Sequence, residues 1–301
     1  MLITCFTVCL LIVTCRGAYF NSRVSKLKLL TIMYKANTKS THYHFSPLLR
    51  VGDEERPDTA LIILNSPIGS PPSPIFVNLW SLSNFRVCAD GGANRLYDET
   101  KNQENDKYIP DLIRGDLDSL RPSVRDFYSQ KGVKIEKDPC QNTNDLDKCL
   151  EVVQKEWLNR VSNNFQVCVY GAFGGRFDQE MASIQALFKW KNAFQSKLFL
   201  YDHNTSAFLL SESVLNEIRL VFHGDGEIPE GDIGDGPTCG LIPIGTRCDS
   251  VETKGLKWNL EASPLEFGGL ISSSNRVMDQ VVTVRSSHPL IFTSEVKCSK
   301  S

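Results

Sequence analysis

The segment Asp111-Leu-Ile-Arg-Gly-Asp-Leu-Asp-Ser119 joins a short apolar stretch to a glycine and two carboxylates, and the fold prediction starts from it. Its apolar pair predicts a buried strand of a parallel sheet that ends at Gly115. In open α/β sheets, ligands bind just beyond the carboxyl ends of such strands. Alternation along an extended chain would place Asp116 and Asp118 on the same side.

Two carboxylates held side by side repel one another unless a positive charge lies between them. A divalent hard cation, which takes oxygen ligands, would remove that repulsion. For an isolated Gly-Asp-x-Asp, a solvated acidic turn is the better interpretation. The rest of the chain must therefore decide between a metal site and a turn.

Strand-like and helix-like segments alternate over residues 59–203 and predict an α/β domain, with a mainly parallel sheet covered on both faces. The expected strands are 60–64, 85–89, 112–114, 134–136, 166–170 and 197–201. The expected helices are 75–82, 122–131, 145–158 and 179–191, and a further helix is expected to open at Ala93.

Short β-like segments without intervening helices follow over residues 204–298 and predict an antiparallel β-sandwich or barrel, of which the sandwich is the expected form. The expected strands are 206–210, 217–222, 239–243, 247–253, 269–272 and 280–285. The Gly- and Asp-rich stretch 223–238 predicts a mobile surface loop.

Residues 1–58 are predicted to be a poorly ordered leader, with the ordered protein beginning near Thr59. The apolar run 2–14 is similar to the core of a signal peptide, but it lacks the basic segment that normally precedes one. The run is also too short to predict a transmembrane helix.

The composition excludes several partners. With 33 basic and 35 acidic side chains, the net charge is -2, so neither a nucleic-acid partner nor a membrane partner is expected.

None of the 10 cysteines forms a Cys-x-x-Cys pair, and several lie in apolar strand-like runs. Reduced thiols, and hence a cytoplasmic protein, are expected.

Two glycine-rich turns follow other predicted strands. Asp90-Gly91-Gly92-Ala93-Asn94 precedes a predicted helix, where paired glycines and free N–H groups could receive a phosphate. Gly-Gly also serves any tight strand-to-helix turn. The turn Gly171 to Gln179 adds Arg176, which could pair with a phosphate or be a surface cation, and Asp178.

Asp145, at the start of a predicted helix, by itself suggests a charge favoured by the helix dipole. Together with Asp90, Asp116, Asp118 and Asp178, it predicts a metal and phosphate site at one edge of the sheet. The sequence contains no Gly-x-x-x-x-Gly-Lys-Ser/Thr, so it is not a P-loop enzyme. It contains no Gly-x-Gly-x-x-Gly either, which argues against a dinucleotide oxidoreductase.

These motifs resemble the thiamine pyrophosphokinase family from about Pro47 to Lys297, over both predicted domains. The matching segments are Cys88 to Tyr97, Gly115 to Pro122, Gly174 to Gln179, Cys239 to Gly245, Gly255 to Leu260, Ser272 to Asn275 and His288 to Leu290. The resemblance implies transfer of pyrophosphate from ATP to the hydroxyl of thiamine, which gives thiamine diphosphate and AMP. It also implies Mg²⁺ and a homodimer with sites at the subunit interface.

The resemblance also implies roles for individual residues. Metal and catalytic roles fall on Asp116, Asp118 and Asp145. ATP-binding roles fall on Asp90, Gly91, Gly92, Asn94, Arg95, Arg176 and Asp178. Thiamine-binding roles fall on Gln179, Trp258, Ser272, Ser274 and Asn275, with the indole of Trp258 as a platform for the thiazolium cation.

The sequence departs from the family pattern before Asp145. The family commonly has Asp-x-Thr-Asp there, whereas this chain has Asn142-Thr-Asn-Asp145. An amide thus replaces one carboxylate, and Asn144 stands in place of the usual threonine.

Two other functions are compatible with parts of the sequence. One is a Mg²⁺-dependent phosphohydrolase with Asp116 as nucleophile and Asp118 as acid. The other is a secreted binding protein whose α/β half is only a scaffold. A core position for Trp258 is likewise an alternative to thiamine binding.

Overall fold

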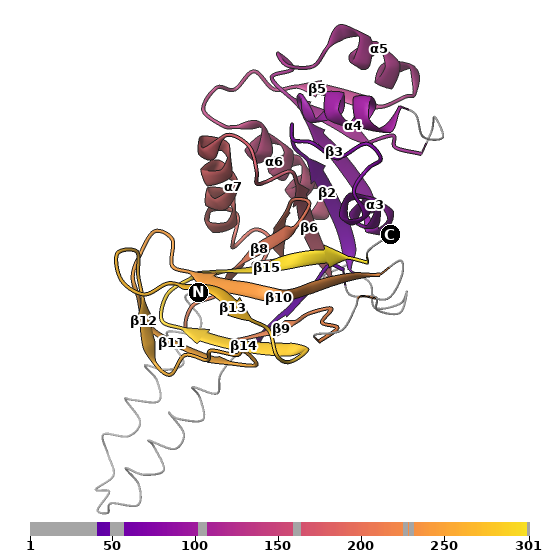
Figure 1. Cartoon of the computed structure of the whole chain (residues 1–301). Helices are drawn as coiled ribbons and strands as arrows, with labels where there is room; N and C mark the ends of the chain where they lie inside the picture. Colours follow the sequence, from indigo (N-terminus) through magenta and orange to yellow (C-terminus); the bar gives the residue numbers. More distant parts are fainter. Residues whose placement is uncertain are drawn as a thin grey trace, which may run out of the picture. The chain divides into compact units, whose positions relative to one another are not determined.

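A parallel sheet organises the first half of the computed structural model, which describes residues 41–48, 57–101, 107–158, 164–224, 228 and 232–299 (Figure 1). Its strands are β2 (Asp58–Ile63), β3 (Phe85–Ala89), β4 (Leu112–Gly115), β5 (Lys134–Lys137), β6 (Phe165–Tyr170) and β7 (Leu198–Tyr201). They lie in the order β7-β6-β2-β3-β4-β5, and every neighbouring pair is parallel.

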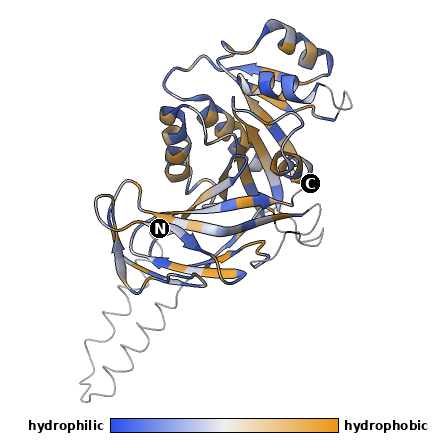
Figure 2. Ribbon diagram, in the orientation of Figure 1, coloured by the Kyte–Doolittle hydropathy of each residue, from blue (hydrophilic) through white to orange (hydrophobic). Residues whose placement is uncertain are grey.

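Helices cover both faces of this sheet (Figure 1). They are α3 (Pro74–Leu82), α4 (Gly92–Thr100), α5 (Pro122–Gln130), α6 (Asp145–Leu158) and α7 (Phe177–Lys189). In β2, Ala60 and Ile62 pack with α6 and α7, whereas Leu61 and Ile63 pack with α3 and α4. This two-sided burial explains why the strand is a continuous apolar run (Figure 2).

The same sheet continues into the second half of the chain. Strands β8 (Thr205–Leu210), β15 (Leu290–Cys298), β10 (Ile233–Ile242) and β13 (Ser272–Arg276) follow β7 in that order, and all are paired antiparallel. The chain reverses between β7 and β8 because Asp202 Oδ1 accepts the backbone N–H groups of Asn204 (2.8 Å) and Thr205 (2.7 Å).

A second sheet packs on this antiparallel half. Its strands are β1 (Thr41–Phe45), β9 (Leu215–Arg219), β14 (Val281–Ser286), β11 (Cys248–Lys254) and β12 (Ser263–Leu265), in that order. The predicted fold class, a parallel-rich α/β part followed by a largely antiparallel β part, is confirmed. The division into domains near residue 203 stays a prediction, because one sheet runs through both parts.

Some predicted elements were wrong. Residues 41–45 belong to the predicted leader but form β1, so order begins before Thr59; residues 1–40 and 49–56 lie outside the described residues. Part of the predicted loop is strand, because Ile233 to Asp235 pair with β15. Strand β15, which lies between β8 and β10, is not predicted from the sequence. No helix of the described chain is long and apolar enough to span a membrane.

A buried polar network fixes β1 on the second sheet. β1 pairs in parallel with β9, and His44 lies opposite Ile218 in the register. The His44 Nε2 atom lies 3.0 Å from Asn216 Oδ1, and Asn216 Nδ2 donates to the carbonyl oxygens of Ser211 (2.9 Å) and Val284 (3.2 Å). Because His44 and Asn216 are both buried, losing either partner would leave an unsatisfied polar group.

We expect this histidine to make stability depend on pH. Burial lowers the pKa of His44 from 6.5 to about 4, so below about pH 6.5 the unfolded chain takes up a proton that the folded chain does not. Its contribution is therefore complete above about pH 6.5 and is lost as the pH falls towards about 4.

The stability of wild type relative to His44→Gln should accordingly fall by up to about 2 kcal/mol between about pH 6.5 and about pH 5. Urea unfolding of both proteins at each pH measures this. The glutamine amide can still donate to Asn216, so the comparison isolates titration. A difference that does not change with pH would contradict the assignment.

Candidate active site

Three carboxylates converge at the carboxyl edge of the parallel sheet. Asp90 follows β3, Asp116 follows the adjacent strand β4, and Asp145 begins α6. One oxygen from each lies within 4.8 Å of the others. The convergence follows from topology, because neighbouring parallel strands deliver their last residues to one edge.

A glycine makes this convergence sterically possible. A Cβ atom at Gly115 would lie 2.7 Å from Asp90 Cβ and 3.1 Å from Asp145 Oδ1. Any side chain at this position would therefore push two of the three carboxylates apart. The glycine that predicted the end of the strand also sets the spacing of the acidic group.

Asp90 is buried and only partly satisfied. Its Oδ2 atom accepts the Ser119 N–H (3.2 Å), whereas its buried Oδ1 has no hydrogen-bond partner among the described residues. Burial raises the pKa of Asp90, and the nearby charges of Asp145 and Asp118 add to this effect. An unsatisfied buried acceptor is costly, so this oxygen is suited to a cationic ligand.

Asp116 and Asp118 do not alternate along an extended chain, so that expectation is wrong. Leu117, between them, has a left-handed backbone with φ of 63°, and the Asp118 N–H donates to Asp116 Oδ1 (3.2 Å). That hydrogen bond, followed by the charge of Lys148, lowers the pKa of Asp116. The Asp118 carboxylate is exposed, accepts the Ser119 hydroxyl (3.0 Å) and lies outside the three-carboxylate group.

Lys148 is a site residue that the sequence analysis missed. It is only 2% exposed, and its Nζ lies 3.0 Å from Asp145 Oδ1 and 3.9 Å from Asp116 Oδ2. Burial alone would lower its pKa, but the hydrogen bond and charge of Asp145, with the charge of Asp116, raise it overall. The available signal was its place three residues after Asp145, on the same helix face.

The departure at Asn144 preserves the start of α6. Asn144 Oδ1 accepts the Asp147 N–H (2.8 Å), as expected of an N-cap residue. Asp147 in turn accepts the Trp190 indole N–H (2.7 Å) and the Lys189 ammonium (2.9 Å), which ties α6 to the end of α7. Asparagine therefore keeps Asp145 in place.

A pocket of about 430 Å³, the carboxylate pocket, surrounds the acidic group. Of the predicted site residues, its lining includes Asp90, Gly91, Asp116, Asp145, Arg176 and Gln179. Its other polar lining residues are not predicted from the sequence and include Asn65, Ser66, Thr143, Lys148, Glu180 and Ser183. They lie just after β2, just before α6, or on α6 and α7, without a distinctive local motif.

Several predicted ATP-binding residues brace the pocket from outside its lining. Gly92 lies against β2, since a Cβ there would be 2.3 Å from the Ile63 carbonyl oxygen. Asn94 Nδ2 donates to the Ser119 carbonyl (2.7 Å), and Asn94 Oδ1 accepts the Arg121 N–H (3.2 Å). Arg95 Nε donates to Asn65 Oδ1 (3.2 Å).

The start of α7 carries an exposed ion pair. Arg176 Nε donates to Asp178 Oδ1 (3.0 Å), and both side chains are mostly exposed. Such a pair contributes little to stability, so Arg176 is free to exchange Asp178 for another anion. The preceding loop is held by Glu180, whose Oε1 accepts the N–H groups of Gly174 (2.9 Å) and Gly175 (3.0 Å).

The predicted thiamine residues of the second half cluster around an exposed indole. Trp258 is 56% exposed, which rules out the alternative of a core tryptophan. Asn275 holds its backbone by accepting the Trp258 N–H (3.2 Å) and donating to the Trp258 carbonyl (2.8 Å), and it also donates to Ser272 Oγ (3.1 Å). Ser274 is exposed with φ of 55°. Among the described residues that line the carboxylate pocket, Trp258, Ser272, Ser274 and Asn275 are absent.

Two family models match the chain. The thiamin pyrophosphokinase catalytic domain matches residues 76–200, and the thiamin pyrophosphokinase vitamin B1 binding domain matches residues 227–291. The chain belongs to the thiamin pyrophosphokinase family. The first match contains the acidic group and most of the carboxylate pocket, and the second contains Trp258 and Asn275.

Individual relatives agree with this assignment. The chain is 38% identical to thiamine pyrophosphokinase 2 of Arabidopsis thaliana, over 79% of this chain and 86% of that protein. It is 30% identical to thiamine pyrophosphokinase of Saccharomyces cerevisiae, over 90% and 93%. The crystal structure of the yeast enzyme superposes with a TM-score of 0.71 at 27% identity, covering 85% of this chain and 91% of that one.

The predicted family and the predicted enzyme class, a thiamine pyrophosphokinase, are confirmed. A scaffold role for the α/β half is wrong, because that half matches the catalytic domain. The phosphohydrolase alternative gains no support, because Asp118 lies outside the acidic group that contains Asp116.

We expect Asp90→Asn, Asp116→Asn and Asp145→Asn each to weaken Mn²⁺ binding by at least about tenfold, since each removes one oxygen ligand from a shared site. Asp118→Asn should have a smaller effect. Electron paramagnetic resonance titration of the full chain measures free Mn²⁺. Asp126→Asn, an exposed change on α5, is the control. Equal losses for Asp118→Asn and Asp116→Asn would contradict the grouping.

Proposed function

We propose that the chain transfers pyrophosphate from ATP to the hydroxyl of thiamine, giving thiamine diphosphate and AMP. The observation that carries this proposal is the group of Asp90, Asp116 and Asp145 with the buried Lys148, inside the region that matches the family catalytic domain. A pocket of about 430 Å³ beside it has the size of a small-molecule site.

The acidic group fits Mg²⁺. Its donors are hard oxygens, the Oδ1 of Asp90 is buried without a partner among the described residues, and the Lys148 ammonium pairs with only two of the three carboxylates. Asp90, Asp116 and Asp145 are therefore the proposed ligands, with Asp90 in the place first assigned to Asp118. When bound, Mg²⁺ would neutralise charge on the transferring phosphates.

The chain's own residues supply position and charge. Lys148 is held by Asp145 and keeps two carboxylates from repelling one another before substrates bind. Arg176 can leave its exposed pair with Asp178 to meet a phosphate at the rim of the pocket. In phosphoryl transfer, such positioning and charge neutralisation account for most of the catalysis.

Thiamine is proposed to bind between two copies of the chain. Trp258 offers an indole that is 56% exposed, on a backbone held by Asn275, to the thiazolium cation, in place of the Lys257 ammonium that lies 4.7 Å from the ring centroid. Trp258 is exposed and does not line the carboxylate pocket of its own chain. A homodimer in which each copy completes the other's site would account for both its exposure and its absence from that pocket.

A cytoplasmic location is also part of the proposal. Cys88, Cys149, Cys168, Cys239 and Cys248 are buried free thiols. Burial raises the pKa of the Cys168 and Cys239 thiols, which keeps them protonated and unreactive. Such thiols suit a reducing compartment. The signal-like run at residues 2–14 lies outside the described residues.

We expect the purified full-length protein, incubated with ATP, Mg²⁺ and thiamine, to form equal amounts of AMP and thiamine diphosphate. Liquid chromatography separates both products, and omission of thiamine should abolish AMP formation. Asp116→Asn is expected to lose nearly all turnover with its circular dichroism unchanged. Release of ADP and phosphate without thiamine would instead indicate a hydrolase.

We expect Trp258→Ala to weaken thiamine binding by about 1–3 kcal/mol, with little effect on ATP binding, because a cation–π contact and apolar area are lost. Trp258→Phe should recover part of this loss. Isothermal titration with each ligand measures it. Equal weakening of both ligands, with a lower melting temperature, would indicate a structural role instead.

Mixed dimers test the sharing of the site between copies. A heterodimer of Trp258→Ala and Asp116→Asn would carry both lesions in one site and leave the other site intact. Activity should therefore rise above that of either parent after subunit exchange. No recovery, with exchange verified by mass spectrometry, would rule out a shared site.

A further inference from the structure

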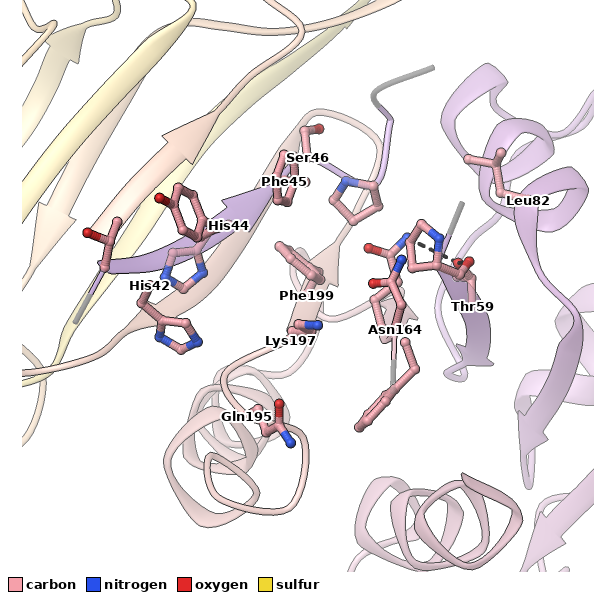
Figure 3. Close-up of a pocket in the computed structure, with 16 residues that line it drawn as sticks. His42, His44, Phe45, Ser46, Thr59, Leu82, Asn164, Gln195, Lys197 and Phe199 are labelled. Atoms are coloured by element: carbon pink, nitrogen blue, oxygen red, sulfur yellow. Dashed lines mark hydrogen bonds between the residues drawn. The ribbon is translucent and has the colours of Figure 1, made fainter. Parts of the chain in front are cut away.

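A second cavity of about 460 Å³ lies at the edge of the sheet opposite the carboxylate pocket. Thr59 and Gln166, the second residues of β2 and β6, line the cavity, and so does Lys197, which directly precedes β7. The same strands end at the carboxylate pocket, at Leu64 and Gly171. Strand β1 forms the opposite wall of this amino-end cavity (Figure 3).

Among the described residues that line the amino-end cavity, Lys197 is the one whose side chain is charged at neutral pH. Lys197 is half-buried, and no carboxylate lines the cavity among the described residues. Burial lowers the pKa of Lys197, and no described acidic group opposes this effect. His42, on the β1 side, hydrogen-bonds through Nδ1 with Ser211 Oγ (3.0 Å). A half-buried ammonium that meets no carboxylate among the described lining residues favours an anionic ligand.

The remaining lining is mostly apolar and aromatic. Phe199, Phe165 and Leu82 contribute side chains to it, and Figure 3 places Phe199 beside Lys197. The Gln166 amide is already engaged, because its Nε2 donates to Thr59 Oγ1 (3.0 Å). A flat apolar body next to one anionic group would match this surface.

The rim of the cavity is built from strained backbone. Gln195, which lines it, and Ser196 have left-handed φ angles of 51° and 58°, although neither is a glycine. Ser196 is buried, and its hydroxyl lies 3.2 Å from Ser211 Oγ, the same atom that meets His42. Consecutive strained residues persist only where the surroundings hold them, and they concentrate at ligand sites.

We propose that the amino-end cavity is a second ligand site, which binds a small aromatic monocarboxylate with its carboxylate on Lys197 and its ring within the apolar part of the lining. A phosphate ester is a poorer match, because its two negative charges would face a single ammonium group in a largely apolar lining. This inference does not depend on the proposed function, since the two pockets share no lining residue.

Fluorine NMR of the full-length protein with para-trifluoromethylbenzoate tests the proposal. Lys197→Met should weaken binding of this probe by at least about tenfold, the loss expected for one charge-assisted hydrogen bond. Lys254→Met, the same change at an exposed lysine of β11, is the matched control and should leave binding unchanged. The neutral probe para-trifluoromethylbenzamide should bind more weakly and should not distinguish wild type from Lys197→Met.

Leu82→Trp, which fills the cavity and keeps the lysine, provides a second test if Lys197→Met does not fold. It should abolish binding of the benzoate, whereas ATP with Mg²⁺ should not displace the benzoate from wild type. Tighter binding of para-trifluoromethylphenyl phosphate than of the benzoate would overturn the monocarboxylate assignment. Equal benzoate binding by wild type, Lys197→Met and Leu82→Trp, or its displacement by ATP, would overturn the site.

Discussion

The mutual repulsion of Asp90, Asp116 and Asp145 is the constraint on which the site depends. Three carboxylates within 4.8 Å of one another would separate if the fold allowed it. They are held by the ends of two adjacent strands and by the first residue of a capped helix, and Lys148 offsets part of the repulsion. The folded protein thus keeps negative charges close together, which favours binding of a cation beside the proposed site of the ATP phosphates.

The three carboxylates can stay this close only because the surrounding sheet is rigid. Strands β2, β3 and β6 are buried on both faces, and the helical layers of the two faces pack on alternate residues of the same strands. Moving one carboxylate would require a shift in a strand that two layers hold. Gly115 shows how little space remains, since a single added carbon would lie 2.7 Å from Asp90 Cβ.

The continuous sheet also relates the two cavities and the two halves of the chain. β2 and β6 run from the amino-end cavity to the carboxylate pocket, so both sites are supported by the same backbone ladders. The reversal at Asp202 then lets the antiparallel half extend the sheet, with Trp258 kept on the surface. An exposed indole on a well-held backbone suits a ligand or a second copy better than a core.

The sequence by itself determined the order of strands and helices in the first half, the strand ends that carry Asp90 and Asp116, and the family. Apolar runs that end at glycine are local signals, and parallel topology follows from their alternation. Trp258 was found only through the family resemblance, because a lone tryptophan has no local signature of exposure.

Only the tertiary structure decided which carboxylates meet. The backbone is left-handed at Leu117 and Asp118 lies outside the three-carboxylate group, whereas Lys148 reaches Asp145 and Asp116 from inside a helix. The strand at residues 41–45 was missed because it pairs with β9 and its His44 contacts Asn216, and both partners lie far away in the sequence. Spacing along the chain predicts which strand or helix carries a side chain, but backbone conformation and long-range packing determine which other side chains it contacts.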